Sequence, residues 1–297
     1  MKAAVAAVVI AMLPASSAWA STHSSAPRAA VHATAITPNG SWTTYHMNDA
    51  RTGYDASAPA ITSVSTTPGW TMPALDDNVY AELLVFNGVV YAATLSGTVY
   101  ALNQTDGSIV WSKSLGTPQT AGWTCGNISS TGILGTPAID TAANRLYAVS
   151  EIVVGTSTTY HLFGLDLANN GNIVLNTTLT TPGFDWRIEQ ERGALAVRNG
   201  YVYVPFGGRA GDCGNYHGYV FAVNTANAAI SGVYTTPGQG MGIWSGGGVV
   251  IDDSTGNVFV STGNGTGAGC DATNTGAPVY ENDAIARLAP ITVAHQD

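Results

Sequence analysis

Two glycine-rich stretches carry the side chains best suited to chemistry in this 297-residue chain. Asp212 lies in GDCGNYHGY, residues 211–219, and Asn264 ends STGN, residues 261–264. Their carboxylate and amide groups are oxygen donors, the kind that a hard cation requires. The structural alternative is that each side chain only hydrogen-bonds its own turn, as Asp and Asn beside glycine often do. The residues alone leave both interpretations open.

Other catalytic arrangements are poorly represented in the sequence. The histidines are scattered and offer no pair at metal-binding spacing on one strand; they are His23, His32, His46, His161, His217 and His295. The sequence contains no Gly-x-Ser-x-Gly elbow and no P-loop. Glu189 and Glu191 could form a paired carboxylate site. We expect them instead to lie in a solvated link with a local ion pair.

A repeated pair of apolar strands must position these loops. Each copy has an apolar strand, a tight turn and a second strand that ends in an aromatic residue. The copies are residues 83–91, 136–147, 194–203 and 248–259, and their last aromatics, Tyr91, Tyr147, Tyr203 and Phe259, recur every 56 residues. Such equal spacing indicates a repeated supersecondary unit. The Asn-Gly pairs at residues 87–88 and 199–200 suit the positive φ angles of a two-residue hairpin.

A third strand follows each hairpin, at residues 98–102, 161–165, 219–223 and 284–288. A fourth strand is clearest at residues 108–112. Four antiparallel strands per repeat predict a propeller blade. The predicted fold class is therefore all-β, a β-propeller of four-stranded antiparallel blades with about four blades present. We expect the last blade to be incomplete, because Asp297 is reached before a fourth strand appears.

The start of the chain predicts an export signal. Lys2, the apolar residues 3–12 and the small-x-small site Ala18-Trp19-Ala20 are typical of one. We expect a signal peptide at 1–20, an extended lead-in at 21–66 and the propeller at 67–297. The expected blades are residues 67–116, 117–180, 181–235 and 236–297.

The composition and the first residues of the chain indicate where the protein is located and which classes of partner it could bind. No later segment approaches the length of a membrane span, and no cysteine near the cleavage site offers a lipid anchor. The predicted location is therefore secreted or periplasmic. The net charge of -9 gives no sign of the basic surface that a nucleic-acid-binding protein requires. An anionic membrane would repel a chain of this charge. A small molecule, a polysaccharide or a protein remains as the partner.

One face of the propeller should gather the candidate residues. The link into the first strand of a blade and the loop between its second and third strands emerge on the same face, which we call the loop face. It should carry Cys125, Asp212, Cys213, Asn264, Cys270 and Asp271. Because Cys213 and Cys270 occupy similar loops of adjacent blades, we predict a disulfide between them. Cys125 would then be free, or paired with a residue outside this chain.

A tryptophan lies in the link before each hairpin; these are Trp70, Trp123, Trp186 and Trp244. The indoles could pack as wedges between neighbouring blades, as buried aromatics usually do. Alternatively they form an aromatic rim that stacks a planar ligand. In that case Trp123, Trp186 and Trp244 are the candidate cofactor contacts.

One segment resembles a known repeat. Residues 101–111, ALNQTDGSIVW, are similar to the signature of PQQ-type propellers, an Ala-Leu-Asp turn, a Thr-Gly and then a Trp, with Asn103 in place of the usual Asp. The resemblance covers roughly residues 42–288 and fades in later blades, where Leu175 replaces the Trp. It implies the PQQ-repeat, quinoprotein alcohol dehydrogenase-like superfamily. Complete rings there have seven or eight blades, so either the chain is a fragment or copies associate to finish the ring.

The same resemblance implies a cofactor site. Some members hold pyrroloquinoline quinone (PQQ) and Ca²⁺ over the propeller axis, whereas others, such as the outer-membrane assembly propeller, are non-catalytic scaffolds. Asp212 matches the position of the Ca²⁺-binding Glu of the dehydrogenases, and Asn264 matches their next ligand. In those enzymes the ion polarises the quinone carbonyl as a Lewis acid.

Three departures from the enzymes count against catalysis. Asp212 is one methylene shorter than Glu, Cys125 is followed by Gly126 instead of a second cysteine, and the catalytic Asp of the enzymes would fall beyond Asp297. We therefore predict an exported propeller that binds a ligand or partner on its loop face without catalysis. The alternative is a PQQ- and Ca²⁺-dependent alcohol dehydrogenase, or a fragment of one.

Overall fold

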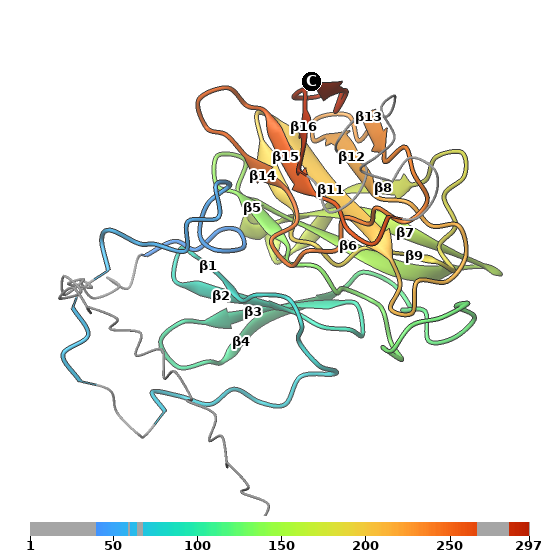
Figure 1. Cartoon of the computed structure of the whole chain (residues 1–297). Coiled ribbons are helices and arrows are strands. Elements are labelled where there is room, and N and C mark those ends of the chain that lie inside the picture. Colours follow the sequence, from blue (N-terminus) through green and yellow to red (C-terminus); the bar gives the residue numbers. More distant parts are fainter. Residues whose placement is uncertain (1–39, 59, 64–67, 266–284, 297) are drawn as a thin grey trace, which may run out of the picture. The chain divides into compact units, whose positions relative to one another are not determined.

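The computed structural model describes residues 40–58, 60–63, 68–265 and 285–296, which form an almost entirely β structure (Figure 1). The first two sheets follow the predicted order of strands. Blade 1 contains β1 (Leu84–Phe86), β2 (Val89–Ala93), β3 (Thr98–Asn103) and β4 (Ile109–Ser114). Blade 2 contains β5 (Ala138–Asp140), β6 (Arg145–Val154), β7 (Ser157–Asp166) and β8 (Asn172–Leu179), with the 3-10 helix η1 (Leu167–Asn169) between the last two.

The remaining two sheets repeat this pattern. Blade 3 contains β10 (Ala196–Arg198), β11 (Tyr201–Gly208), β12 (Tyr219–Asn224) and β13 (Ile230–Thr235), and the short strand β9 (Glu189–Gln190) also pairs with β11. Blade 4 contains β14 (Val250–Ile251), β15 (Val258–Ser261), β16 (Ile285–Leu288) and β17 (His295–Gln296). All pairings are antiparallel, and apart from β9 with β11 each joins strands that are neighbours in sequence. The predicted fold class of four-stranded antiparallel blades is confirmed.

The expectation that the last blade lacks a fourth strand is wrong. β17 pairs with β16, with Leu288 opposite His295. A tight turn makes this possible, because Ala289 and Ala294 are joined by a backbone hydrogen bond of 2.7 Å and Val293 inserts into the core. A two-residue strand leaves no apolar alternation for a sequence pattern to detect.

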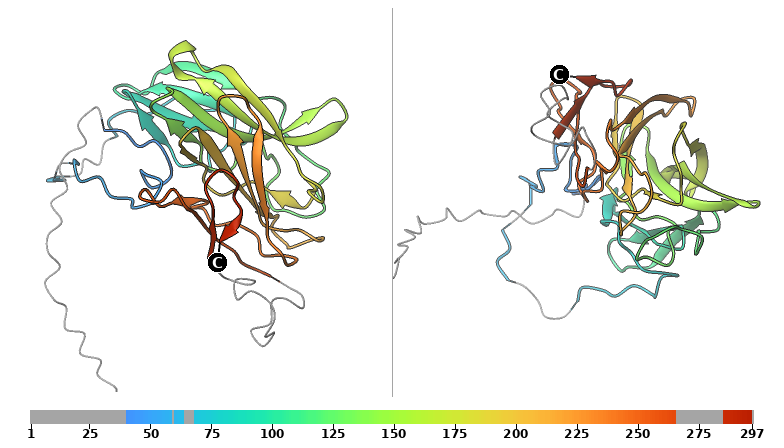
Figure 2. Two further views of the ribbon diagram at one scale, coloured as in Figure 1. Left: turned by 90° about the horizontal axis from the view of Figure 1, so that it is seen from above. Right: turned by 45° about the vertical axis from the view of Figure 1, so that its right-hand side comes forward.

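The hydrophobic core lies between successive blades. Side chains alternate between the two faces of a strand, so a central strand can contribute to two interfaces. Tyr91 and Ala101 of blade 1 pack with Leu146 of blade 2, whereas Tyr147 of blade 2 packs with Phe221 of blade 3. A third cluster joins blades 3 and 4. Figure 2 shows these sheets from two further directions.

Residues 42–51 form a segment that we call the axial strap, because it contacts the first-strand side of every blade. Trp42 exchanges backbone hydrogen bonds of 2.7 and 2.8 Å with Val85 beside β1 in blade 1. Thr43 accepts from Ile139 of blade 2 at 2.7 Å, and Asp49 accepts from Ile251 of blade 4 at 3.0 Å, both through backbone atoms. This part of the expected lead-in is therefore an integral element of the propeller.

Arg51 completes the axial strap at blades 3 and 4. Its guanidinium donates to the carbonyl of Leu195 at 2.8 Å and to that of Val249 at 2.7 and 3.0 Å. Each carbonyl lies in the segment that enters the first strand of its blade. The strap thus ties together segments more than 140 residues apart in sequence.

Within the described residues, no helix is long and apolar enough to cross a membrane. The predicted signal peptide, residues 1–20, lies outside the described residues.

Candidate ligand and cation site on the loop face

Asp212 and Asn264 lie together, although they come from different blades. Asp212 is in the loop between β11 and β12, and Asn264 follows β15. The Asn264 amide nitrogen lies 3.5 Å from Asp212 Oδ1, and both residues are exposed. Both have left-handed backbone angles, with φ of 48° and 61°. The loop face therefore presents a carboxylate and an amide side by side.

Glycines allow the link into blade 4 to approach the loop that carries Asn264 closely. Gly242 and Gly263 exchange two backbone hydrogen bonds of 2.9 and 3.2 Å. At Gly240, whose φ is 78°, an added Cβ would lie 2.2 Å from the carbonyl oxygen of Asn264. Any other side chain at Gly240 would push the Asn264 backbone away from Asp212.

Tyr216 orients the Asp212 carboxylate. Its hydroxyl donates to Asp212 Oδ1 at 2.7 Å, and its ring packs directly against Gly208. Burial, together with the hydrogen bond to Asp212, raises the pKa of Tyr216 well above its usual range. The hydroxyl therefore stays protonated and remains a donor to Asp212.

The disulfide at this site differs from the predicted one. Cys213 bonds Cys125, with a Cα–Cα distance of 6.0 Å, so the predicted Cys213–Cys270 pair is wrong. The reason is that the link into blade 2 runs along the link into blade 3, where Thr124 donates to the carbonyl of Arg187 at 3.1 Å. This brings Cys125 to the loop of blade 3. Cys270 and Asp271 lie outside the described residues.

The three candidate tryptophans have different environments. The Trp123 indole donates to Glu151 Oε1 at 3.1 Å and lies 5.1 Å from the Arg209 guanidinium carbon. Trp186 packs against the core between blades 2 and 3. These contacts favour the packing interpretation for both. Trp244 is 42% exposed and lies beside Gly207 and Gly242, so its ring is accessible to a ligand.

Three buried glutamates lie between blades 2 and 3. Glu151 pairs with Arg209 at 2.7 Å. Glu189 accepts from the backbone N–H of His217 at 3.0 Å, and burial raises its pKa to about 8. Glu191 accepts from Gly135 at 3.2 Å, and burial raises its pKa well above the usual range. The solvated link expected for Glu189 and Glu191 is therefore wrong, because pairing of β9 with β11 draws the link inward.

A polar pocket of about 550 Å³ lies where the axial strap meets the links into all four blades. We call it the axial pocket; it is lined by Tyr45, Val79, Tyr80, Asn127, Ile128, Leu134, Thr136, Arg192 and Gly246. Arg192 is exposed, and among the described residues its side chain has no ion pair or hydrogen bond. No sequence pattern indicates this pocket, because its lining residues come from the links into four different blades and from the strap.

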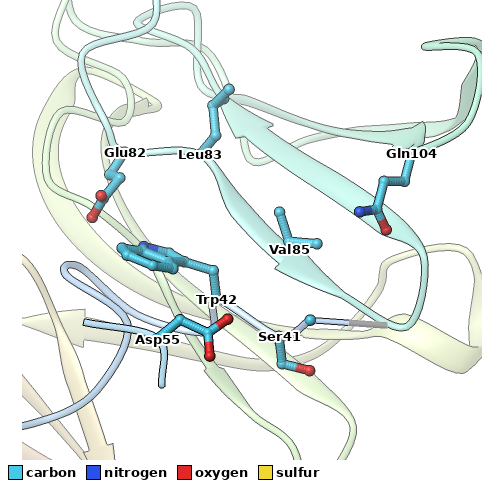
Figure 3. A pocket seen from close by; sticks show the side chains of 8 residues that line it. Ser41, Trp42, Asp55, Glu82, Leu83, Val85 and Gln104 are labelled. Carbon is cyan, nitrogen blue, oxygen red and sulfur yellow. The ribbon is translucent and has the colours of Figure 1, made fainter. Parts of the chain in front are cut away.

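A second pocket of about 440 Å³ lies against blade 1 (Figure 3). Its lining includes Trp42 of the strap, Leu83, Val85 and the carboxylates of Asp55 and Glu82. None of the candidate residues lines it. The candidate residues do not line the axial pocket either, but that pocket is formed by the links into the blades and contains the exposed Arg192. The axial pocket is therefore the better candidate for an anionic ligand on the loop face.

A family model described as outer membrane protein assembly factor BamB matches residues 59–297. The chain belongs to this PQQ-repeat family. The resemblance carried by residues 101–111 is thereby confirmed. No curated protein matches the chain.

Solved structures of PQQ-repeat type share the fold. Two quinohemoprotein alcohol dehydrogenases, from Comamonas testosteroni and Pseudomonas putida HK5, are 17% and 18% identical, with TM-scores of 0.61 and 0.59. The match covers 89% of this chain in each case, but 41% and 42% of theirs. A europium-containing methanol dehydrogenase has 15% identity, covers 87% and 48% of the two chains, and has a TM-score of 0.54. The chain thus spans less than half the length of these structures, and the likeness shows the fold.

The residues present fit part of the cation site that the resemblance to the quinoprotein dehydrogenases implies. Asp212 supplies a carboxylate, and Asn264, whose amide nitrogen contacts it, would supply an oxygen donor after rotation of its amide. Among the described residues, no group of three His, Cys, Asp or Glu side chains converges to hold a metal ion. Because Ca²⁺ takes six to eight oxygen ligands, the remaining ones would have to come from a ligand and from water.

Proposed function

We propose that this chain binds an anionic small molecule on its loop face, together with a hard cation such as Ca²⁺ held by Asp212 and Asn264. The observation that carries the proposal is the contact between the Asn264 amide nitrogen and the Asp212 carboxylate, which brings a carboxylate and an amide together from separate blades. Structural turn residues would need no such contact across blades.

The side chains around the pair support this role. Tyr216 occupies one lone-pair direction of Asp212 Oδ1 and leaves the other carboxylate oxygen available. Asn264 would turn its amide so that Oδ1, the oxygen, faces the cation; the amide orientation is readily exchanged by a rotation about its terminal bond. A bound cation would supply positive charge and Lewis acidity to an oxygen of the ligand.

Arg192 supports the anionic nature of the ligand. Its guanidinium faces the axial pocket without a partner among the described residues, in a chain whose net charge is -9. Guanidinium groups recognise carboxylates through paired N–H donors. Tyr45 and Tyr80 add aromatic surface to the same pocket. A ring-bearing carboxylate fits this combination of charge and aromatic surface.

The cation site is tested by calorimetric titration of the purified protein with Ca²⁺. We expect Asp212→Asn to weaken Ca²⁺ binding at least about tenfold, equivalent to roughly 1.4 kcal/mol, because it removes the only charged donor of the pair. The matched control is Asp252→Asn, since Asp252 is a half-buried carboxylate that only caps the turn after β14. Absence of Ca²⁺ binding at millimolar concentration, or equal affinity in Asp212→Asn, would overturn the proposal.

The anion site is tested with PQQ, a planar tricarboxylate, as the probe. We expect Arg192→Gln to weaken PQQ binding by about tenfold or more, because Arg192 is the one cationic side chain among the described residues that line the axial pocket. The Ca²⁺ affinity measured without PQQ should stay unchanged. Equal PQQ binding by Arg192→Gln and wild type would place the anion elsewhere.

A PQQ- and Ca²⁺-dependent dehydrogenase is the second candidate. It is favoured by the fold shared with the quinohemoprotein enzymes and by the accessible indole of Trp244. Dye-coupled oxidation of alcohols by the PQQ- and Ca²⁺-loaded protein tests it. Sustained turnover that Asp212→Asn abolishes would establish the enzyme over the binding protein.

The proposal includes export of the protein, so that the ligand is bound on the loop face outside the cytoplasm. It is carried by the predicted signal at residues 1–20. Sequencing the N-terminus of the exported protein tests it, and a mature chain beginning at Ser21 is the expected result.

A further inference from the structure

Arg209 begins the turn that presents Asp212. It directly follows β11, and its backbone N–H donates to the carbonyl of Ile188 at 2.9 Å. Its own carbonyl accepts from the N–H of Asp212 at 3.1 Å, which closes the turn. The position of Asp212 therefore depends directly on where Arg209 is held.

The Arg209 side chain is held by blade 2 and by the links. It is 1% exposed and donates to Glu151 Oε1 of β6 at 2.7 Å and to the Tyr160 hydroxyl of β7 at 3.1 Å. It also donates through two nitrogens to the carbonyl of Trp186, at 2.9 and 3.2 Å. The guanidinium lies over the ring of Trp123. These contacts fix the start of a blade 3 loop to residues outside blade 3.

A covalent bond holds the other side of Asp212. Cys213, the next residue, is bonded to Cys125 in the link into blade 2. Gly211, with φ of 104°, lies so close that an added Cβ would be 3.4 Å from Cys125 Cβ. Asp212 is therefore the exposed tip of a turn that is anchored on one side through Arg209 to blade 2 and the link into blade 3, and on the other side through Cys213 to the link into blade 2.

Stability alone gives no reason for a buried ion pair here. Buried pairs can often be replaced by apolar side chains of similar volume without loss of stability, because their desolvation offsets their attraction. A directional, multidentate anchor is different, because it fixes a single loop geometry. At Arg209 that geometry sets the exposed Asp212 carboxylate beside Asn264.

We propose that Arg209 is a positioning residue, which holds Asp212 in place for the cation through the Glu151, Tyr160 and Trp186 contacts. The Cys125–Cys213 disulfide is the second anchor of the same turn. This inference rests on the proposed cation site, but it concerns residues that never touch the cation. Arg209 has no direct access to the loop face, since it is fully buried.

The test compares Arg209→Lys with the matched control Arg198→Lys, whose ion pairs with Asp49 and Asp253 lie at the end of β10. Lysine retains a charge for Glu151 but cannot hold the Trp186 carbonyl with two nitrogens. We expect Ca²⁺ affinity to fall about fivefold or more in Arg209→Lys and to stay unchanged in Arg198→Lys. In the Asp212→Asn background, Arg209→Lys should cause no further loss, because both changes act through one carboxylate.

Hydrogen exchange of the Asp212 amide gives a second readout that requires no cation. Since this N–H is bonded to the Arg209 carbonyl, we expect faster exchange at Asp212 in Arg209→Lys, with unchanged exchange in the strands of blade 3. If Arg209→Lys fails to fold, the double variant Glu151→Gln/Arg209→Met removes both buried charges and takes its place.

The outcomes separate the two proposals. Wild-type affinity and wild-type exchange at Asp212 in a folded Arg209 variant would overturn the positioning role. If the wild-type protein binds no Ca²⁺, the proposed cation site fails, and the exchange of the Asp212 amide still decides whether Arg209 holds the turn.

Discussion

At the scale of single residues, burial changes the chemistry of two glutamates that look like surface residues in the sequence. Glu189 and Glu191 lie next to the charged residue Arg192, yet they are buried whereas Arg192 is exposed. One oxygen of each glutamate has no hydrogen-bond partner. A protonated carboxyl tolerates this environment better than a carboxylate does, which is why their pKa values are raised.

The raised pKa values predict that the folded protein loses stability as pH rises. The folded state holds the Glu189 proton up to a pKa of about 8, whereas the unfolded chain releases it near pH 4.5. The stabilisation is therefore complete below about pH 4.5 and is lost between there and about pH 8, with Glu191 acting in the same direction. For Glu189 alone the loss is on the order of 5 kcal/mol at most.

Urea unfolding at pH 5 and pH 8 measures this loss. Glu189→Gln should make the unfolding free energy less dependent on pH, because the amide does not titrate and can still accept from His217. Glu82→Gln, a change at a half-buried glutamate bonded to the backbone of His46, is the control and should keep the wild-type dependence. An unchanged pH dependence in Glu189→Gln would show that Glu189 is already ionised in the fold.

At the scale of elements, the axial strap performs a task that the blades cannot perform alone. The strands of each sheet pair only within that sheet, and the apolar cores between the blades are built from side chains. The strap adds backbone and guanidinium hydrogen bonds to all four first-strand regions. It also provides Tyr45 to the wall of the axial pocket.

Removing the Arg51 guanidinium should loosen this element. We expect Arg51→Met to lower the unfolding free energy by about 2–4 kcal/mol, because the carbonyls of Leu195 and Val249 lose their charged donor. Chemical denaturation measures the change. Arg145→Met is the control, since its guanidinium makes a single contact of 3.4 Å to the Thr225 carbonyl. Equal losses in both variants would contradict a special role for the strap.

At the scale of the whole molecule, local periodicity was sufficient to predict the architecture. The 56-residue spacing of Tyr91, Tyr147, Tyr203 and Phe259 predicts four repeats, and each of these residues lies in the second strand of its sheet. Blade geometry also places the β11–β12 and β15–β16 loops on one face. Asp212 and Asn264 could therefore be assigned to the same face, because strand alternation and turn chemistry are local properties of the chain.

Tertiary structure alone decided which of the candidate residues meet. Cys213 pairs with Cys125 and not with Cys270, because the links of blades 2 and 3 run together. The burial of Glu189, the axial strap and the axial pocket likewise arise from contacts between segments far apart in sequence. A repeat pattern specifies each blade, but it contains no information about how links and loops pack once the blades are side by side.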